Sequence, residues 1–356
     1  MKAPQRSLPL VLLVLGCLHA APVWDGAYPV VRISVLPANG GTPKFSHALA
    51  ILRPTLQHDE PLRTFEVDLR SGAFILRQTD IFVKDVMPLS LTRTHRAWVQ
   101  GMLAFGMGAN HPYDAAPTGT RFPYTYLDIN LEDGNSVHFP RISQGTGFAD
   151  AVYEHSSTAS EFFGGRIAWN GDGWTMHLRN GFVYLFPEAY NAKSLAQGAA
   201  TEIRNPQGQR IRLQRDAQRN LRRLISPNNH TIDFIYNGTR IDAAQDDSGR
   251  SVGYFYDDAG HLTAVSDNAK HWTRFTYEQD LITTVQDETG VLLTNTYDNR
   301  RVVQQKVADG SVYRYRYIWN SAGELQQTQV TMPDGTGVAL TFDHGRLISQ
   351  DPIPGF

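Results

Sequence analysis

The repeating unit of this chain is clearest at residues 254–267, which read YFYDDAGHLTAVSD. Tyr254 and Tyr256 stand two positions apart, a polar turn ending in Gly260 follows them, and a second apolar–polar alternation closes the unit. Residues two apart on a strand face the same side of a sheet, and glycine accepts the positive φ of a tight turn. These residues predict a β-hairpin with an aromatic face.

The unit recurs through the last third of the chain. Five tyrosines follow one another at steps of 20, 21, 20 and 20 residues: Tyr236, Tyr256, Tyr277, Tyr297 and Tyr317. One hairpin of this length cannot bury its aromatic face alone, so the units must stack on their neighbours. We expect these five residues to be structural repeat aromatics, with rings of neighbouring repeats in contact at about 0.5–1.5 kcal/mol per pair.

Two architectures accommodate hairpins with this spacing. Stacked antiparallel hairpins form one spiralling sheet, whereas pairs of 20-residue units would form the blades of a β-propeller. A propeller would alternate between odd and even units, but the spacing here repeats at every unit. The spiralling sheet is therefore the main prediction, and a β-propeller or β-solenoid is the alternative.

The residues upstream of the repeats also indicate strands. Alternation with period two runs through residues 64–139, and Asp133-Gly134 and Asn180-Gly181 are strong hairpin-turn signals. No segment combines a helical apolar stripe with a capping box. We therefore predict an all-β chain, with a β-rich pre-repeat module at residues 63–200 and β-hairpin repeats at residues 201–356.

The first residues are typical of an export signal. Lys2 and Arg6 precede an apolar run at residues 8–18, and small residues follow. This run is shorter than the roughly 20 residues that a membrane-spanning helix requires. We predict an export signal at residues 1–20, an extended or poorly ordered lead at residues 21–62, and a secreted, periplasmic or cell-surface protein.

Cys17 allows two fates for the exported chain. The preceding residues 14–16 resemble a bacterial lipobox, in which case the Cys17 thiol would carry a lipid anchor. Cleavage after Ala20 would instead leave a mature chain without cysteine, which suits an oxidising compartment equally well. A membrane contact is expected only through that lipid.

The composition excludes several other classes. The 356 residues include 33 Lys and Arg against 35 Asp and Glu, so a nucleic-acid partner is not expected. A hydrophobic content of 41% with 19% charged residues argues against general disorder. A single cysteine rules out an internal disulfide.

No motif in the sequence predicts a catalytic, cofactor or metal site. The histidines form no metal-binding motif, and the densest group, residues 58–60, lies in a proline-flanked stretch. We expect no cofactor and no enzyme activity, with self-cleavage near Asp343, His344 and Asp351 as the one catalytic alternative.

The motif Tyr-Asp-x-x-Gly-basic-Leu at residues 256–262 resembles the YD repeat of the bacterial Rhs (rearrangement hotspot) and wall-associated protein family. Residues 67–94 are similar to the module that precedes the repeats in that family, and residues 104–108 resemble its Phe-Gly-x-Gly element. Residues 342–353 resemble the Gly-Arg-Phe-x-Ser-x-Asp-Pro element that closes the repeats, with Leu347 at the usual Phe position.

The resemblance implies a hollow β-shell that encloses a toxin domain in a polymorphic toxin system. The sequence ends at the closing element, so we expect either a short member without a C-terminal toxin tip or the front piece of a larger gene product. Its expected role is that of a secreted or surface-tethered structural or encapsulating protein, with a toxin domain or other cargo as partner. The alternative is a carbohydrate- or cell-surface-binding module, with Trp169, Trp174, Trp272 and Trp319 as candidate glycan contacts.

Overall fold

The computed structural model describes residues 28–36, 43–52, 55–56, 60–157 and 160–356. These residues form thirty strands and two short 3₁₀ helices, η1 (Pro112–Asp114) and η2 (Leu195–Gln197), which confirms the all-β prediction. Within the described ranges, no helix has the length and apolar character that a membrane crossing requires. The predicted export signal and Cys17 lie outside the described residues.

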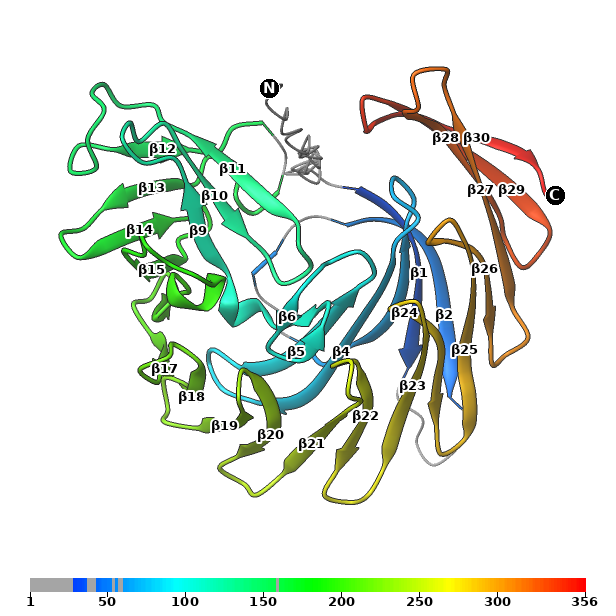
Figure 1. Cartoon of the computed structure of the whole chain (residues 1–356), viewed down its shortest axis with the longest axis horizontal. Coiled ribbons are helices and arrows are strands. Elements are labelled where there is room, and N and C mark those ends of the chain that lie inside the picture. Colours follow the sequence, from blue (N-terminus) through cyan, green and yellow to red (C-terminus); the bar gives the residue numbers. More distant parts are fainter. Residues whose placement is uncertain (1–27, 37–42, 53–54, 57–59, 158–159) are drawn as a thin grey trace, which may run out of the picture.

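Most of the chain belongs to one antiparallel sheet of nineteen strands, in which each strand pairs with the next along the sequence. The sheet curves into an open arc (Figure 1), as predicted for stacked hairpins and unlike the separate sheets of a propeller. Its strands are β12 (Val152–Glu154), β13 (Arg166–Trp169), β14 (Gly173–His177), β15 (Val183–Pro187), β16 (Glu202–Arg204), β17 (Arg210–Arg215), β18 (Leu221–Ile225), β19 (Thr231–Asn237), β20 (Arg240–Asp246), β21 (Ser251–Tyr256), β22 (Leu262–Asp267), β23 (Trp272–Glu278), β24 (Leu281–Asp287), β25 (Gly290–Asp298), β26 (Arg301–Val307), β27 (Val312–Trp319), β28 (Leu325–Thr331), β29 (Thr336–Asp343) and β30 (Arg346–Pro354).

The strands before this sheet form what we call the N-terminal module, residues 28–140. A six-stranded sheet has the order β2-β1-β3-β4-β5-β8, and a three-stranded sheet and a two-stranded ribbon complete the module. Its strands are β1 (Tyr28–Leu36), β2 (Lys44–Leu52), β3 (Arg63–Asp68), β4 (Phe74–Val83), β5 (Leu89–Arg96), β6 (Met102–Leu103), β7 (Gly106–Met107), β8 (Ala109–Asn110), β9 (Ala116–Gly119), β10 (Tyr126–Asn130) and β11 (Ser136–Pro140).

Two expected segment boundaries differ from the observed elements. Strands β1 and β2 fall within residues 21–62, the expected lead, because Val30, Val31 and Ile33 bury their side chains in the module. The large sheet begins at β12 and crosses residue 200, where the repeats were expected to start. Its first strands carry no regular spacing, since the long connection containing η2 interrupts the hairpin period.

A repeated irregularity accounts for the curvature of the large sheet. Shifts in strand register fall directly before Tyr236, Tyr256, Tyr277 and Tyr297. In β27 the shift falls after Ile318, one residue beyond Tyr317. A β-bulge bends its strand and increases the local twist. Because the bulge recurs at the same place in successive hairpins, the bends add in one direction.

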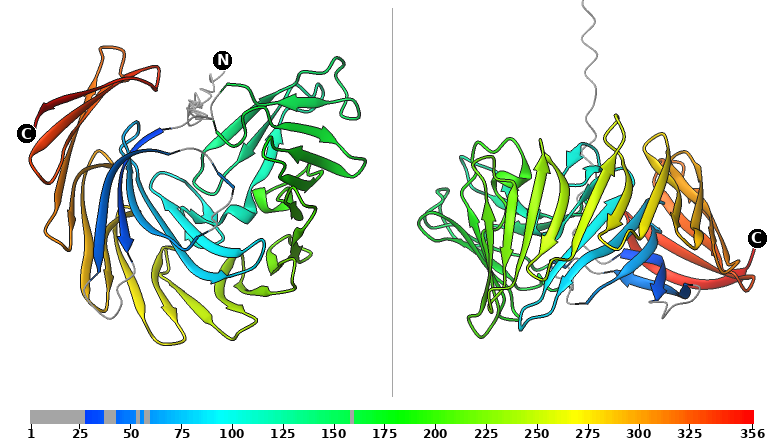
Figure 2. Two further views of the ribbon diagram at one scale, coloured as in Figure 1. Left: turned by 180° about the vertical axis from the view of Figure 1, so that it is seen from behind. Right: turned by 90° about the horizontal axis from the view of Figure 1, so that it is seen from below.

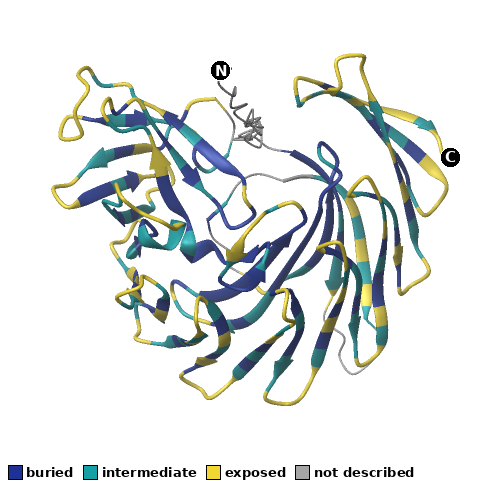
Figure 3. Ribbon diagram, viewed as in Figure 1, coloured by how far each residue is buried: buried dark blue, intermediate teal, exposed yellow. Residues whose placement is uncertain are grey.

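The N-terminal module lies on the concave side of this arc and covers part of it (Figure 2). We call the concave face of the β12–β30 sheet the wall. One continuous cluster of buried apolar side chains runs from the module into the wall, and exposed residues concentrate in the outer turns (Figure 3). The module and the wall therefore share one core.

The turn at residues 104–108 illustrates how closely the two parts meet. The Met107 amide donates a hydrogen bond of 3.0 Å to the Gly260 carbonyl in the wall. A Cβ on Gly106 would lie 2.3 Å from that same oxygen, and the φ of Gly106 is +86°. Only glycine fits there, so the Phe-Gly-x-Gly element specifies where the module contacts the repeats.

We predict that Gly106→Ala lowers the free energy of unfolding by more than Gly101→Ala does. Both positions have a positive φ, but a Cβ on Gly101 would meet nothing within 4 Å. The left-handed backbone costs about 1–2 kcal/mol in both variants, and overpacking against Gly260 adds about 1–3 kcal/mol in Gly106→Ala alone. Urea unfolding of both variants measures the difference, and equal losses would contradict the close contact.

Candidate functional site on the wall

The five repeat tyrosines lie along the wall and link one repeat to the preceding one. Four hydroxyls each donate to the carbonyl of the residue fifteen positions earlier: Tyr256 to Ile241 at 2.6 Å, Tyr277 to Leu262 at 2.8 Å, Tyr297 to Ile282 at 2.7 Å, and Tyr317 to Val302 at 2.8 Å. The Tyr236 hydroxyl interacts with the backbone of Leu221, again fifteen residues earlier. The tyrosines that repeat about every 20 residues in the sequence therefore make the same hydrogen bond in successive repeats.

The expected contact between rings of successive repeats is wrong. Among the described residues, none of these five rings contacts another of the five; their ring partners lie elsewhere, as in the contact of Tyr277 with His261. Successive tyrosines stand two strands apart, roughly 10 Å in a sheet with about 4.8 Å between strands. A phenol cannot reach the next phenol across that distance, but its hydroxyl reaches the backbone of the strand between.

The basic residue in one repeat packs its side chain on the tyrosine ring of the following repeat. The Arg240 guanidinium lies 4.6 Å from the centre of the Tyr256 ring, and the His261 ring stacks on Tyr277 at 4.6 Å and 21°. Cation–π and stacking contacts of this kind stabilise by about 0.5–2 kcal/mol. The motif position therefore serves packing between repeats.

Burial determines the protonation of the tyrosines. Removal from water raises the pKa of Tyr256, Tyr277, Tyr297 and Tyr317 well above the ordinary value of 10. All four therefore stay protonated as hydrogen-bond donors at any physiological pH. A phenol in this state is a structural donor and a poor base or nucleophile.

Backbone hydrogen bonds attach the module to the wall at the same positions. The Ile241 amide donates to the Ala104 carbonyl at 2.8 Å, and the Val302 amide donates to the Gly72 carbonyl at 3.0 Å. Ile241 and Val302 are also the residues whose carbonyls accept the tyrosine hydroxyls. Each such residue therefore joins two repeats through its carbonyl and the module through its amide.

A buried ion pair of the module contacts the wall at the boundary between the two, which we call the seam. Arg93 and Asp80 in the module pair at 3.2 Å with side chains only 1% exposed. The Tyr254 hydroxyl of the wall donates to the same Asp80 at 3.1 Å, and Arg93 lies 5.4 Å from the Phe275 ring centre. Removing one partner would leave a buried charge unpaired, at a cost of about 3–5 kcal/mol.

Other polar contacts extend the seam toward both ends of the wall. Arg215 of the wall pairs with Asp114 at 2.8 Å. His47 on β2 accepts from or donates to the Tyr313 hydroxyl at 2.6 Å and Asp309 at 3.0 Å. The seam therefore depends on matched polar partners as well as on apolar burial.

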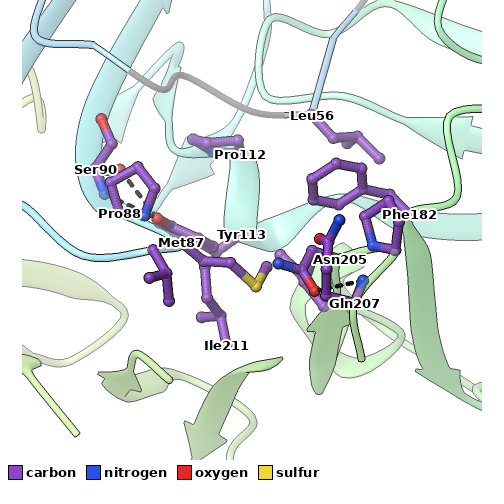
Figure 4. A pocket seen from close by; sticks show the side chains of 13 residues that line it. Leu56, Met87, Pro88, Ser90, Pro112, Tyr113, Phe182, Asn205, Gln207 and Ile211 are labelled. Carbon is purple, nitrogen blue, oxygen red and sulfur yellow. Dashed lines mark hydrogen bonds between the residues drawn. The ribbon is translucent and has the colours of Figure 1, made fainter. Parts of the chain in front are cut away.

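A cavity of about 440 Å³ opens at the seam between the module and strands β15–β17 (Figure 4). Its lining is mainly apolar, with Met87, Pro112 and Phe182 among the contributors. The Tyr113 hydroxyl facing it is bound to the backbone of Ser90, at 3.2 Å to both the amide and the carbonyl. The cavity offers apolar contact and no arrangement of groups for acid–base or nucleophilic chemistry.

The four tryptophans considered as glycan contacts do not share one surface. Trp174 is fully buried and donates to Glu188 at 2.5 Å, and Trp169 packs beside it at 5.3 Å. Trp272 packs on Phe255 in a distant repeat, and Trp319 near the C-terminus lies under Arg301. The structure thus provides no common stacking platform from these residues.

Of the C-terminal candidates for self-cleavage, Asp343 and His344 are neighbours, and Asp351 has a different partner. His344 contacts Glu324 at 3.3 Å and lies 3.8 Å from Asp343. Asp351, on β30, accepts a hydrogen bond from Ser349 at 2.8 Å. Of the group at residues 58–60, only Glu60 is described, and the described part of the chain holds no cluster of three potential metal ligands.

Sequence reasoning missed the charged residues of the seam. Arg93 and Asp80 stand on strands whose pattern predicts an outward polar face, yet both are buried against the wall. The first residues of β5 alternate leucine with serine and threonine, as a strand with one wet face does, yet all eight residues of the strand are buried.

Comparison with known proteins supports the family resemblance. Residues 66–139 match a family model described as a domain of unknown function, DUF6531. The probable deoxyribonuclease RhsA of Dickeya dadantii (strain 3937) is 26% identical over 241 residues, 60% of this chain and 16% of that protein. The probable deoxyribonuclease RhsB of the same strain is 26% identical over 251 residues, 62% of this chain and 16% of that protein.

The predicted resemblance is thereby confirmed as distant homology to Rhs proteins. The chain spans about a sixth of the length of these two relatives. Similar solved structures include the Photorhabdus luminescens Tc holotoxin pore, with a TM-score of 0.33 and 11% identity over 82% of this chain and 20% of that chain. A TcdB2–TccC3–Cdc42 structure has a TM-score of 0.33 and 12% identity over 92% of this chain and 18% of that chain.

We predict that Tyr317→Phe lowers the free energy of unfolding by about 1–3 kcal/mol, because the Val302 carbonyl loses its buried donor. Tyr190→Phe is the matched control, since Tyr190 is 53% exposed, and its loss should be near zero. Chemical denaturation of both variants provides the measurement. A Tyr317→Phe loss no larger than that of the control would show that the hydroxyl links contribute nothing.

Proposed function

We propose that this chain is a non-catalytic structural segment of a protein shell, exported from the cell, whose wall encloses its own N-terminal module. The proposal rests on the hydrogen bonds of Ile241 and Val302. Each residue bonds to a neighbouring repeat through its carbonyl and to the module through its amide. The inner surface is thus occupied by structural contacts in two of the repeats. Distant homology to Rhs proteins supports the same role.

The proposed partner is a polypeptide cargo such as a toxin domain. The large sheet is an open arc with a concave side, and the module covers part of it (Figure 2). Enclosure of a further polypeptide would use the same backbone donors and apolar rows that hold the module. The word deoxyribonuclease in the relatives' names describes those proteins, and we propose that this segment contributes structure without nuclease activity.

A pair of valine-to-cysteine variants tests whether the wall is sealed in solution. Val302 is fully buried at the seam, whereas Val291, on the preceding strand, is 47% exposed. In a Cys17→Ser background, we predict that the thiol of Val302→Cys reacts at least about a hundredfold more slowly with a water-soluble reagent than that of Val291→Cys. This ratio corresponds to an opening free energy of about 3 kcal/mol or more.

Comparable rates for the two thiols would contradict a sealed wall and would favour an open, hydrated face that binds small substrates. Incubation of the same preparations with linear DNA and Mg²⁺ provides a second measurement. We expect no cleavage, and activity that co-purifies with the folded chain would contradict the non-catalytic role.

The intact mass of the chain expressed with its first residues tests the export proposal. We predict a mature protein that begins at Ala21, because the basic and apolar segments precede small residues there. A mass carrying a diacylglycerol on Cys17 would identify the surface-tethered form. An unprocessed chain confined to the cytoplasm would contradict export in either form.

A further inference from the structure

Two buried histidines lie at the seam and face the wall. His95, on β5, is 4% exposed, and its ring contacts Tyr277 at 6.3 Å. His111, directly before η1, is completely buried, and its ring contacts Phe234 at 6.2 Å. Both histidines belong to the module and both aromatic partners belong to the wall.

The surroundings of His95 disfavour protonation of its imidazole ring. Its Nδ1 is buried without a hydrogen-bond partner, and the Arg93 guanidinium lies on the same strand two residues earlier. His261 is the other cationic group near it, and Tyr277 is the facing phenol. Burial, Arg93 and His261 together lower the pKa of His95 to about 3.

The surroundings of His111 act in the same direction. Both ring nitrogens are buried without hydrogen-bond partners, and the neighbouring rings are Phe105, Tyr113 and Phe234. Burial lowers the pKa of His111 and Arg215 adds to this, although Asp114 and Glu132 oppose it. Asp114 lies 3.9 Å from the ring, but it is already paired with Arg215 at 2.8 Å.

We propose that His95 and His111 make the seam acid-sensitive, so that mild acid releases this part of the N-terminal module from the wall. Above pH 6.5 both rings are neutral whether the module is docked or released. Below that value the released rings bind protons that the docked rings cannot, so docking weakens as the pH falls. The lowered pKa of His95 alone reduces the equilibrium constant for docking about thirtyfold at pH 5 relative to neutral pH.

Two other histidines near the seam have acidic partners, and their positions indicate where release is expected. His261 pairs with Asp257 and Asp280, and because all three belong to the wall, these ion pairs do not depend on docking of the module. His47 contacts Asp309 at 3.0 Å and the Tyr313 hydroxyl at 2.6 Å across the seam, so β2 has its own polar contacts with the wall. Release is therefore expected near β5 and the turn at residues 104–108.

Hydrogen exchange of the full chain measures release at identified amides. The Ile241 amide donates to Ala104 and the Met107 amide donates to Gly260, so both bonds exist only while the module is docked. Between about pH 7.5 and pH 5, we expect their protection factors to fall at least about tenfold. The Ala308 amide, which donates to Leu292 within the wall, should keep its protection.

The double variant His95→Leu with His111→Leu should show no such fall, because leucine binds no proton. His271→Leu is the matched control, since His271 is exposed and pairs with Asp267 within the wall, and it should retain the full fall. If the double variant does not fold, His95→Gln and His111→Gln should each show a smaller fall than the natural chain.

Three results would overturn the proposal. Constant protection of Ile241 and Met107 in the natural chain would show that acid leaves the seam closed. An undiminished fall in the double variant, or in both glutamine variants, would assign the effect to other groups. Loss of protection at Ala308 at the same pH would show that the module and the wall unfold together.

Discussion

A sheet nineteen strands long has an apolar concave face, and that face must be kept out of water. The repeats alone cannot cover it, because an open arc has no second sheet packed against it. The N-terminal module supplies the cover, and one continuous core links the two parts. Burial of apolar area at about 25 cal/mol per Å² makes this contact the main source of stability.

Apolar burial does not by itself set the position of the module along the wall. The tyrosine hydroxyls occupy carbonyls in the wall at intervals of one repeat, and the amides of Ile241 and Val302 bond to the module. The buried Arg93–Asp80 pair of the module adds contacts that fit one arrangement, because the Tyr254 hydroxyl donates to Asp80 and Arg93 lies over the Phe275 ring. A module shifted by one repeat would leave these groups unsatisfied, so the polar contacts select the register.

The same organisation connects the fold with its proposed role. A shell segment needs an inner face that binds polypeptide backbone, and the wall has backbone donors and apolar rows at regular spacing. His95 and His111 are buried at the seam, where ring nitrogens without hydrogen-bond partners disfavour protonation, and this is the basis of the proposed response to pH. Enclosure and controlled release would then depend on the same surface.

The sequence by itself determined the hairpin repeats, the all-β class and the resemblance to Rhs proteins. These features follow from alternation within strands and from turn residues, which act over a few positions along the chain. The local pattern also located the five tyrosines. The predicted contact between their rings was wrong, because ring contact depends on the distance between strands.

Only the tertiary structure decided which groups meet across the seam. Arg93, Asp80, His95 and His111 stand on the module, and the wall residues that they contact lie more than a hundred positions away in the sequence. Nothing in the local pattern distinguishes a polar residue that faces water from one that faces a distant strand. That difference arises when the curved sheet closes around the module, because burial then requires each charge to find its partner.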